Sequence, residues 1–458
     1  MKLFKKINSY SNYVALIDDS GNSYYYKDLI RFSKNIFKFI KKGSLVILIS
    51  SNTQESISFY VSSIINNYCL ILLDENLDIT FIKDTIKKFD PNFIFYPKKF
   101  DKNFNTKNAV WSSKNYFLVE LSKKNKSEIN KLNTLILTTS GTTQNPKFVR
   151  LSNKNIYVNA FQILKYLKIK KEDTTITTMP MAYSYGLSII NTHLENGSKI
   201  ILNNDSVINI NFWKKIKKNK VNSLGGVPAI YEYLRRIKFE NMLPSSIRYL
   251  TVAGGKLDSE VLKYLYKICK KKKINFFSMY GQTEAGPRIS YVNITKNPNK
   301  INAIGVPVIN SKIKILSEKN IIITKKNKIG ELVYFGNNVS LGYASKKIDL
   351  KNGDSNKGKI FTGDLGYKDK DNFFFLTSRK KRISKLFGLR LNLDDIENLL
   401  KKKGFKVNSI VNDKYIQLNY ISNYQEDIIK NIIFENFKIN KNYIKCTLVS
   451  KSNKFKTL

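Results

Sequence analysis

The sequence predicts an α/β fold: a large N-terminal domain of helix-covered, mostly parallel sheets with a small β subdomain, then a small C-terminal α+β domain. Three observations lead to this prediction. Strand-length apolar runs alternate with segments of helical periodicity over residues 24–228, glycine-punctuated β-rich runs follow from about residue 300, and a short basic segment of mixed pattern runs from 382 to the end. Such alternation is typical of parallel sheets covered by helices. We expect domains at 1–377 and 382–458.

The individual elements follow from the periodicity of the apolar residues. Helical spacing predicts helices over residues 24–41, 58–68, 81–89, 153–167 and 185–194. Between them, short apolar runs predict strands over residues 44–50, 69–74, 92–96, 135–137, 174–180 and 199–203. In the later β subdomain we expect strands over residues 311–324, 330–336 and 372–378. No internal repeat interrupts this order.

The composition excludes several classes of site. The 458 residues include one histidine, His193, and three scattered cysteines, Cys69, Cys269 and Cys446. These cannot form a Cys/His zinc cluster, and a disulfide framework is implausible, so a metal would be a hard cation on oxygen ligands. The basic start has no apolar segment behind it, and no apolar run approaches the roughly 18 residues that span a bilayer. We therefore expect a cytoplasmic protein with no membrane span.

The net charge of +44 raises the question of a nucleic-acid partner. The lysines are spread along the chain, however, and only short runs such as residues 270–273 stand out. These runs follow helix-like segments, where lysines normally form a solvated face. We expect no nucleic acid as the main partner.

The most informative motif is the polar loop at residues 138–147, directly after the predicted strand 135–137. Its glycine, hydroxyl groups and closing lysine offer backbone N–H groups, O–H donors and one positive charge to a polyphosphate. It is not a Walker A loop, because Pro146 precedes Lys147 and Phe148 follows it. Taken alone, the same residues also suit a polar surface turn.

Further motifs follow in a fixed order along the chain. Each is weak by itself, since a turn with a carboxylate or a basic stretch is common on protein surfaces. They comprise the segments at residues 279–284, 330–336 with Gly342 and Tyr343, 361–365, Arg379, 385–390 and 395–397.

The ordered set resembles the acyl-adenylate-forming (AMP-binding) enzymes: acyl-CoA and acyl-carrier-protein synthetases, nonribosomal peptide synthetase adenylation domains and luciferases. The resemblance covers nearly the whole chain and is most specific at residues 138–147, 280–284, 330–336, 361–365 and 387–397. It implies an acid that attacks the α-phosphate of ATP, release of pyrophosphate, and capture of the acyl-adenylate, usually by a thiol.

The resemblance also implies a role for each matching residue. The β- and γ-phosphates would be held by Thr139, Ser140, Gly141, Thr142, Thr143 and Lys147. Glu284 would hold Mg²⁺ and Thr283 would contact the α-phosphate. The base would lie among Gly254, Gly255, Lys256, Tyr280, Gly281 and Gln282, with Tyr280 stacking on adenine. Asp364 would bind the ribose hydroxyls, Arg379 the ribose or phosphate, and Lys385 would also lie at the nucleotide.

A lysine near the C-terminus completes the catalytic set that the resemblance implies. Lys454 is the best match, but the family's preceding glycine is Asn453 here, so Lys451 and Lys456 remain competitors. Two other departures concern Phe148, which stands where the family has glycine after the loop lysine, and Lys381, where many members have aspartate. The resemblance implies a hinge at 378–381 and a small mobile C-terminal α+β domain. Rotation about Lys381 would exchange Lys454 for a face that admits the thiol.

The acyl pocket is the least determined part. The resemblance places Tyr183, Ser184, Gly186 and Gly226 around it, with Tyr183 where acyl-CoA synthetases often have histidine. Ser184 stands where amino-acid-activating members carry aspartate, and a buried ammonium without a carboxylate is costly, so an α-amino acid is disfavoured. Packed aromatic residues are the alternative interpretation of Tyr183 and Tyr185. For His193 we favour a hydrogen-bonded structural role over that of a base.

These observations predict an ATP-dependent carboxylic acid:thiol ligase that uses ATP, Mg²⁺ and either CoA or the phosphopantetheine of a carrier protein. A small carboxylic acid is the expected substrate, and the basic surface would favour an acidic carrier protein. A non-thiol acceptor, a degenerate binding protein and a basic nucleic-acid binder stay open as alternatives.

Overall fold

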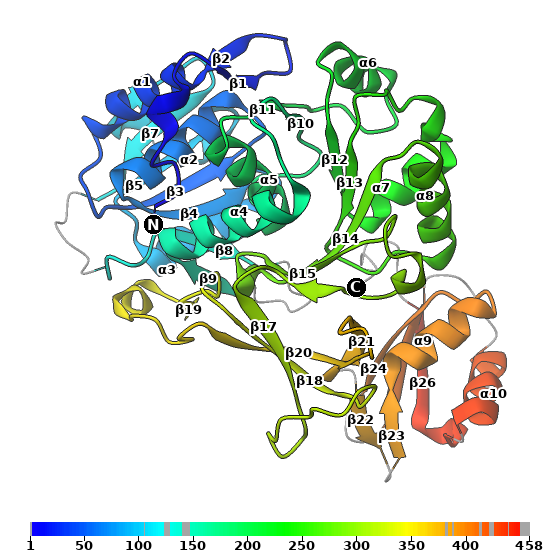
Figure 1. Ribbon diagram of the computed structural model, residues 1–458. Helices are drawn as coiled ribbons and strands as arrows, with labels where there is room; N and C mark the ends of the chain where they lie inside the picture. Colours follow the sequence, from blue (N-terminus) through cyan, green and yellow to red (C-terminus); the bar gives the residue numbers. More distant parts are fainter. Residues whose placement is uncertain are drawn as a thin grey trace. The chain divides into compact units, whose positions relative to one another are not determined.

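The protein is described here from a computed structural model (Figure 1). The described residues are 2–104, 106–122, 129–139, 147–380, 383–386, 389–411, 415–420, 426–437 and 439–448, with the backbone alone for 383–386, 389–392 and 411. The chain forms two compact units. The first comprises Met1–Ile313 and Tyr334–Ile360, and the second comprises Lys314–Val333 and Phe361–Leu458.

The first unit contains two large sheets with parallel centres. In spatial order, the nine-stranded sheet consists of β16 (Val306–Pro307), β15 (Arg288–Asn293), β14 (Asn275–Gly281), β13 (Tyr249–Val252), β12 (Ser223–Gly226), β10 (Thr174–Ile176), β11 (Lys199–Ile201), β1 (Val14–Ile17) and β2 (Ser23–Tyr25). Strands from β14 through to β1 pair in parallel, while β15, β16 and β2 are antiparallel.

The eight-stranded sheet has the same organisation. Its strands are β19 (Gly342–Ala344), β9 (Phe148–Leu151), β8 (Leu135–Thr138), β4 (Cys69–Asp74), β3 (Leu45–Ser50), β5 (Phe93–Pro97), β7 (Tyr116–Glu120) and β6 (Ala109–Ser112). The four central strands β8, β4, β3 and β5 are parallel. Every residue of β3 is buried, as expected for a parallel strand covered on both faces.

Eight helices cover these sheets in the described part of the first unit. They are α1 (Tyr26–Phe37), α2 (Gln54–Asn66), α3 (Ile79–Phe89), α4 (Asn153–Leu167), α5 (Ser184–Glu195), α6 (Ile210–Lys218), α7 (Pro228–Arg236) and α8 (Ser259–Lys271). Side-chain caps explain where several begin, because the oxygen of the preceding residue accepts a hydrogen bond from the first turn. These caps are Thr53, Asp78, Ser152, Asn209 and Asp258.

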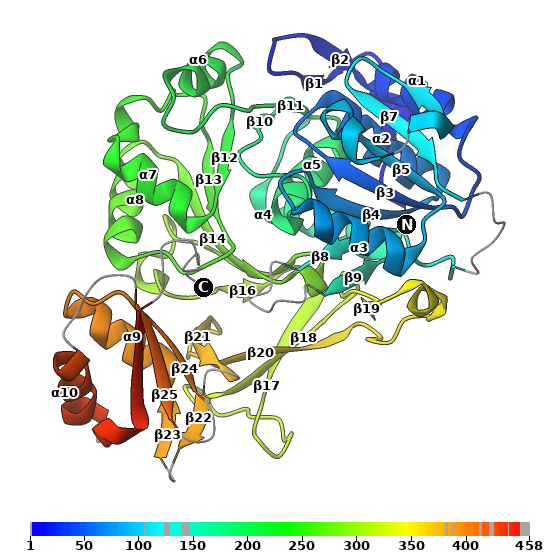
Figure 2. The same ribbon diagram turned by 180° about the vertical axis from the view of Figure 1, so that it is seen from behind.

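Helices α4 and α5 lie between the two sheets (Figures 1 and 2). One side of the pair packs against the eight-stranded sheet through residues such as Ile156 and Leu187. The other side packs against the nine-stranded sheet through Ile163, Leu167 and Tyr185. Both faces of this helical layer are therefore buried, which places α5 in the core of the first unit.

The second unit is built around smaller sheets. One has the order β17 (Ser311–Leu316), β18 (Gly330–Gly336), β20 (Lys359–Lys368) and β21 (Phe374–Arg379), and β22 (Ile383–Leu386) pairs with β23 (Leu389–Asn392). The third contains β24 (Val407–Val411), β25 (Ile416–Tyr420) and β26 (Ile444–Leu448), and it packs with α9 (Leu393–Lys402) and α10 (Glu426–Phe437) around Ile396, Leu418 and Ile433.

The predicted α/β class is confirmed, and the differences lie at element ends. In the predicted strand-rich segment 311–324, β17 ends at Leu316, because Asn320 adopts a positive φ of 59° and its N–H donates to the Ser317 carbonyl in a turn. Ile322 forms an antiparallel bridge with Leu316 beyond that turn. The predicted helix 24–41 starts later, since Ser23–Tyr25 pairs with β1. The predicted strand 174–180 ends at Ile176. The boundary at 377 and the hinge at 378–381 stay predictions, and Lys381 lies outside the described residues.

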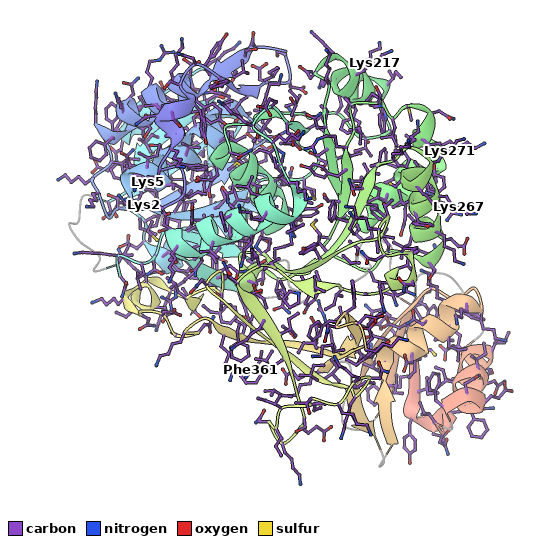
Figure 3. All side chains as sticks on the ribbon, in the orientation of Figure 1. Lys2, Lys5, Lys217, Lys267, Lys271 and Phe361 are labelled. Carbon is purple, nitrogen blue, oxygen red and sulfur yellow. The ribbon has the colours of Figure 1, made fainter. Side chains whose placement is uncertain are left out.

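The surface lysines behave as the charge pattern indicates. Figure 3 shows Lys217 on α6 and Lys267 and Lys271 on α8 extending away from the ribbon, and the run at residues 270–273 is exposed throughout. Among the described residues, no helix combines the length and the apolar character needed to cross a bilayer.

Candidate active site

The predicted phosphate loop connects two adjacent strands of the eight-stranded sheet. The N–H of Thr139 donates to the carbonyl of Lys147 at 2.9 Å, and the N–H of Lys147 donates to Thr139 Oγ1 at 3.3 Å. The two ends of the loop are therefore held together where β8 and β9 pair. The predicted contacts at Ser140, Gly141, Thr142 and Thr143 lie outside the described residues.

Phe148, where the resemblance leads us to expect glycine, has a packing role. Its ring is buried, with centroids 4.8 Å from that of Phe89 and 6.2 Å from that of Phe81, both on α3. The residue after the loop lysine is thus fixed by apolar contacts, which orients the exposed Lys147 beside it.

The second predicted segment begins in β14 and ends in the short 3₁₀ helix η5 (Thr283–Ala285). Gly281 is required by packing, because a Cβ atom there would lie 1.9 Å from the Pro287 carbonyl oxygen. The N–H of Gln282 donates to the same oxygen at 2.9 Å. This close approach turns the chain so that Thr283 and Glu284 leave the carboxyl end of β14.

Glu284 and Lys147, which are distant in sequence, both contact Tyr343. Tyr343 of β19 donates its hydroxyl proton to Glu284 Oε1 at 2.7 Å, and Lys147 Nζ lies 4.7 Å from the centroid of the Tyr343 ring. Burial, with a further contribution from the Glu284 charge, raises the pKa of Tyr343, so the phenol remains a donor at neutral pH. The structure therefore links the loop lysine to the predicted metal ligand through one aromatic side chain.

Thr283 contacts the start of α5. Its Oγ1 lies 3.2 Å from Ser184 Oγ, while Tyr183, the residue before the helix, is 52% exposed. Gly186 is buried one turn inside, where a Cβ atom would come within 2.3 Å of the Pro180 carbonyl oxygen. The start of α5 thus lies next to the predicted α-phosphate contact, and Gly186 is needed there for close packing.

The remaining predicted residues of the first unit follow the ends of adjacent parallel strands. Gly226 ends β12, Gly254 and Gly255 follow β13, and Tyr280 and Gly281 end β14, with these strands neighbouring one another in that order. Carboxyl ends of parallel strands form the usual ligand crevice of open α/β sheets. Gly254 has a φ of +85°, a conformation that suits glycine, and Lys256 is exposed. The amide of Gln282 lies 3.5 Å from the Tyr280 hydroxyl.

In the second unit, the structure pairs two predicted residues. Asp364 on β20 and Arg379 on β21 face each other in register, with Arg379 Nε 3.4 Å from Asp364 Oδ1. Asp364 is buried, whereas the Arg379 side chain is 58% exposed and can therefore reach other groups. Lys454 and the side chain of Lys385 lie outside the described residues.

Tyr343 and Arg288 were not among the predicted site residues. A sequence signal exists for Tyr343, because the Gly342-Tyr343 pair follows the motif at residues 330–336. For Arg288 the sequence contains no such signal, and its burial beside α5 becomes visible only in the fold. His193 is confirmed as a buried, hydrogen-bonded residue: its Nδ1 lies 2.8 Å from the Ile189 carbonyl.

The side chains present fit a nucleoside triphosphate and a hard divalent cation. Lys147 supplies a positive charge, Thr283 a hydroxyl, and Glu284 a carboxylate. The Tyr343 hydroxyl donates a hydrogen bond to Oε1 of Glu284, whereas among the described residues no donor contacts Oε2. A carboxylate held at one oxygen and open at the other suits Mg²⁺, which prefers few protein oxygens together with phosphate.

Residues 3–344 match the AMP-binding enzyme family. The chain therefore belongs to the AMP-binding enzymes, which confirms the resemblance of its motifs.

Among curated relatives, the 2-succinylbenzoate–CoA ligase of Bacillus mycoides (strain KBAB4) is 28% identical over 265 residues, which cover 58% of this chain and 53% of the relative. A second 2-succinylbenzoate–CoA ligase, from Bacillus cereus (strain Q1), is 28% identical over 267 residues, with 58% and 53% covered. The matched part thus spans about half the length of these relatives.

Solved structures share the fold over nearly the whole chain. The o-succinylbenzoate CoA synthetase (MenE) from Bacillus subtilis, in complex with its acyl-adenylate intermediate, has a TM-score of 0.77 at 18% identity, covering 99% of this chain and 96% of that one. McyG A-PCP complexed with phenylalanyl-adenylate has a TM-score of 0.73 at 18% identity, covering 97% and 78%. The fold class derived above is therefore shared with these proteins.

Proposed function

We propose that this chain is an AMP-forming acid:thiol ligase. A carboxylate oxygen attacks the α-phosphorus of ATP, the bond to the bridging oxygen breaks, and pyrophosphate leaves with the electron pair. A thiolate then attacks the acyl carbon, a thioester forms and AMP leaves. The observation that carries the proposal is the convergence of Lys147, Thr283, Glu284 and Tyr343 at the carboxyl ends of the parallel strands.

Each residue of the proposed site has a role that follows from its side chain. Lys147 and the loop it closes neutralise the β- and γ-phosphates, which become the leaving group. Thr283 donates its hydroxyl to the α-phosphate, and Ser184 beside it orients that hydroxyl. Glu284 holds Mg²⁺, and the bound cation supplies charge neutralisation at the triphosphate. A structure of the Bacillus subtilis relative contains ATP and a magnesium ion, which supports this choice of cofactors.

The other predicted residues complete the nucleotide site. Tyr280, with Gly254, Gly255, Lys256, Gly281 and Gln282, binds the base, while Asp364 and Arg379 of the second unit bind the ribose. Lys385 and Lys454 act from the C-terminal segment, with Lys454 at the reacting carboxylate. These assignments rest on the resemblance of the motifs and on the pairing of Asp364 with Arg379.

CoA is the acceptor that the relatives' names favour, and 2-succinylbenzoate is a candidate acid on the same ground. The phosphopantetheine of an acidic carrier protein is the second acceptor, favoured by the charge of +44. Reaction in the cytoplasm fits either acceptor.

The test measures pyrophosphate release with ATP and Mg²⁺ over a panel of acids that includes 2-succinylbenzoate, with hydroxylamine as the trap. CoA and a phosphopantetheinylated carrier protein are then compared as acceptors. Acid-dependent release that is lost in Lys147→Ala supports the proposal. ATP binding without release for any acid would argue against a ligase and for a binding protein.

A further inference from the structure

A buried arginine follows the predicted phosphate loop on β9. Arg150 lies three residues after Lys147, and only 1% of it is exposed. The strand β9 pairs with β19, the edge strand that contains Tyr343. None of the roles proposed above uses the Arg150 charge. A buried charge is costly unless polar groups satisfy it, so the partners of Arg150 indicate its role.

The guanidinium of Arg150 holds one segment of the chain, residues 341–353. Its Nε donates to the carbonyl of Tyr343 at 3.1 Å. Its five N–H groups meet five acceptors in all, and four of these are backbone carbonyls from the two ends of the segment. The acceptors are the carbonyl oxygens of Leu341, Tyr343, Asn352 and Gly353 and the Oδ1 atom of Asn133.

The register of β9 and β19 brings the guanidinium to this segment. Gly342 lies opposite Arg150, and Tyr343 lies opposite Val149. A Cβ atom at Gly342 would lie 3.2 Å from a terminal nitrogen of Arg150, so the glycine leaves room for the guanidinium. The direction of a side chain on a strand follows from the backbone. The hydrogen bond to the Tyr343 carbonyl therefore constrains the direction of the Tyr343 ring.

The chain that Arg150 holds contacts Glu284. The Tyr343 hydroxyl donates to Glu284 Oε1 at 2.7 Å. The N–H of Ser340, one residue before the held segment, donates to the Glu284 carbonyl at 2.8 Å. The Tyr343 ring also has Lys147 Nζ 4.7 Å from its centroid. One buried arginine thus connects the strand after the loop lysine to the segment that meets Glu284.

We propose that Arg150 is a positioning residue of the active site, which holds Tyr343 where its ring lies beside Lys147 and its hydroxyl donates to Glu284. This inference rests on the proposed function. Because Arg150 and the loop lysine belong to the same edge of the sheet, the lysine and the carboxylate keep a fixed relation before ATP binds. Arg150 itself touches no substrate and acts through Tyr343.

The first test substitutes Arg150 and follows the use of ATP. Arg150→Gln keeps a neutral amide donor but cannot hold both ends of the segment, so kcat/KM for ATP in pyrophosphate release is expected to fall about tenfold. Arg150→Lys keeps the charge without the planar fork and is expected to fall between wild type and Arg150→Gln. Calorimetric titration with Mg·ATP makes the same comparison without turnover, and the Kd is expected to rise by a similar factor.

A double-mutant cycle separates positioning from stability. Tyr343→Leu removes both the hydroxyl and the ring, so Arg150 has no side chain left to position. In that background, Arg150→Gln is expected to change kcat/KM and Kd by less than about twofold, because residues that act through one another are not additive. Equal losses in the two backgrounds would overturn the inference and leave the proposed function standing.

Tyr116→Phe is the matched control. Tyr116 is buried in the same sheet, and its hydroxyl contacts Ser51 and Ser56. Its strand β7 lies near the opposite edge from β19. The loss of these buried hydrogen bonds is expected to lower stability and to leave kcat/KM and Kd within about twofold of wild type. A tenfold loss of kcat/KM in Tyr116→Phe would show that reduced stability alone accounts for the effect of Arg150→Gln, and would overturn the inference.

Two further outcomes are decisive. If neither Arg150 variant folds, positioning cannot be separated from folding, and the inference is overturned. Absence of release with every acid would count against the proposed function, and the titrations with Mg·ATP would then decide the inference: equal Kd values for wild type and Arg150→Gln overturn it.

Discussion

The site around Glu284 and the buried side chain of Arg288 differ in how their charges are satisfied. Glu284 has Tyr343 as a donor, and Lys147 lies over the same ring, with both ions still partly reachable. Arg288 is buried with one open donor. The groups that we propose for the chemistry are thus pre-organised by the chain itself, while the buried guanidinium keeps one donor open.

The largest expected effect is a difference in the free energy of unfolding between substitutions of two buried arginines, Arg150 and Arg288. Arg150→Met leaves five acceptors without their donor and should lower the free energy of unfolding by about 4 kcal/mol. Arg288→Met removes a buried charge that has no ion-pair partner in the described part of the chain. It should therefore lower the free energy of unfolding by about 1 kcal/mol at most, or raise it. Urea unfolding followed by the fluorescence of Trp111 and Trp213 measures both, because both tryptophans belong to the first unit. Equal losses would contradict the distinction between a saturated and an open guanidinium.

The next effect concerns the Glu284 site. Glu284→Gln keeps an oxygen for Tyr343 but removes the charge that we propose as the ligand of Mg²⁺. Pyrophosphate release should then fall about a hundredfold to a thousandfold, as when one preorganised electrostatic group is lost. Glu260→Gln, at an exposed glutamate beside Lys263, is the control and should retain wild-type activity. An undiminished rate in Glu284→Gln would remove Glu284 from the metal site.

His193 lines a small cavity beside α5 and gives a pH-dependent test of its burial there. Its pKa is about 4 in the folded protein, whereas the ordinary pKa of a histidine side chain is 6.5, so the unfolded chain takes up the proton first as the pH falls. Wild type should therefore lose about 3 kcal/mol of stability between pH 6.5 and 4, relative to His193→Asn. The asparagine amide can still donate to the Ile189 carbonyl. Asp173 and Arg248 act electrostatically on the imidazole, while Tyr249 and Arg288 line the same cavity.

The measurement is urea unfolding of both proteins across this pH range. His193 is the only histidine in the chain, so no other imidazole contributes to the difference. Parallel profiles for the two proteins would show that the ring is already hydrated or charged in the folded state.

The smallest effect tests the link between Lys147 and Glu284. Tyr343→Phe removes the hydrogen bond to Glu284 and keeps the ring below Lys147, so kcat/KM for ATP should fall about tenfold. Tyr343→Leu also removes the cation–π contact and should cost a further few-fold. If the two variants behave alike, the ring face contributes nothing to the position of Lys147.

Much of the fold could be predicted from sequence because its signals are local. The apolar run of β3 is buried throughout, and the predicted helices at 81–89 and 185–194 fall within one or two residues of α3 and α5. The prediction fails where the secondary structure depends on a tertiary partner. Ser23–Tyr25 is such a case, because it forms a strand by pairing with β1. The ends of helices and strands also depend on turns such as that at Asn320. Such a turn is difficult to recognise within a β-rich composition.

The sequence by itself determined the family and the chemical inventory: the polar loop closed by Lys147, the segment at 280–284, and the turn with Asp364. These are short motifs whose function depends on neighbouring residues. Only the tertiary structure decided that Tyr343 meets Glu284 across 59 residues and that Arg288 meets Ser188 across 100. Whether a buried charge is satisfied depends on which distant groups surround it, and that is set by the packing of helices against sheets. The local pattern of residues does not show whether a buried charge will be satisfied.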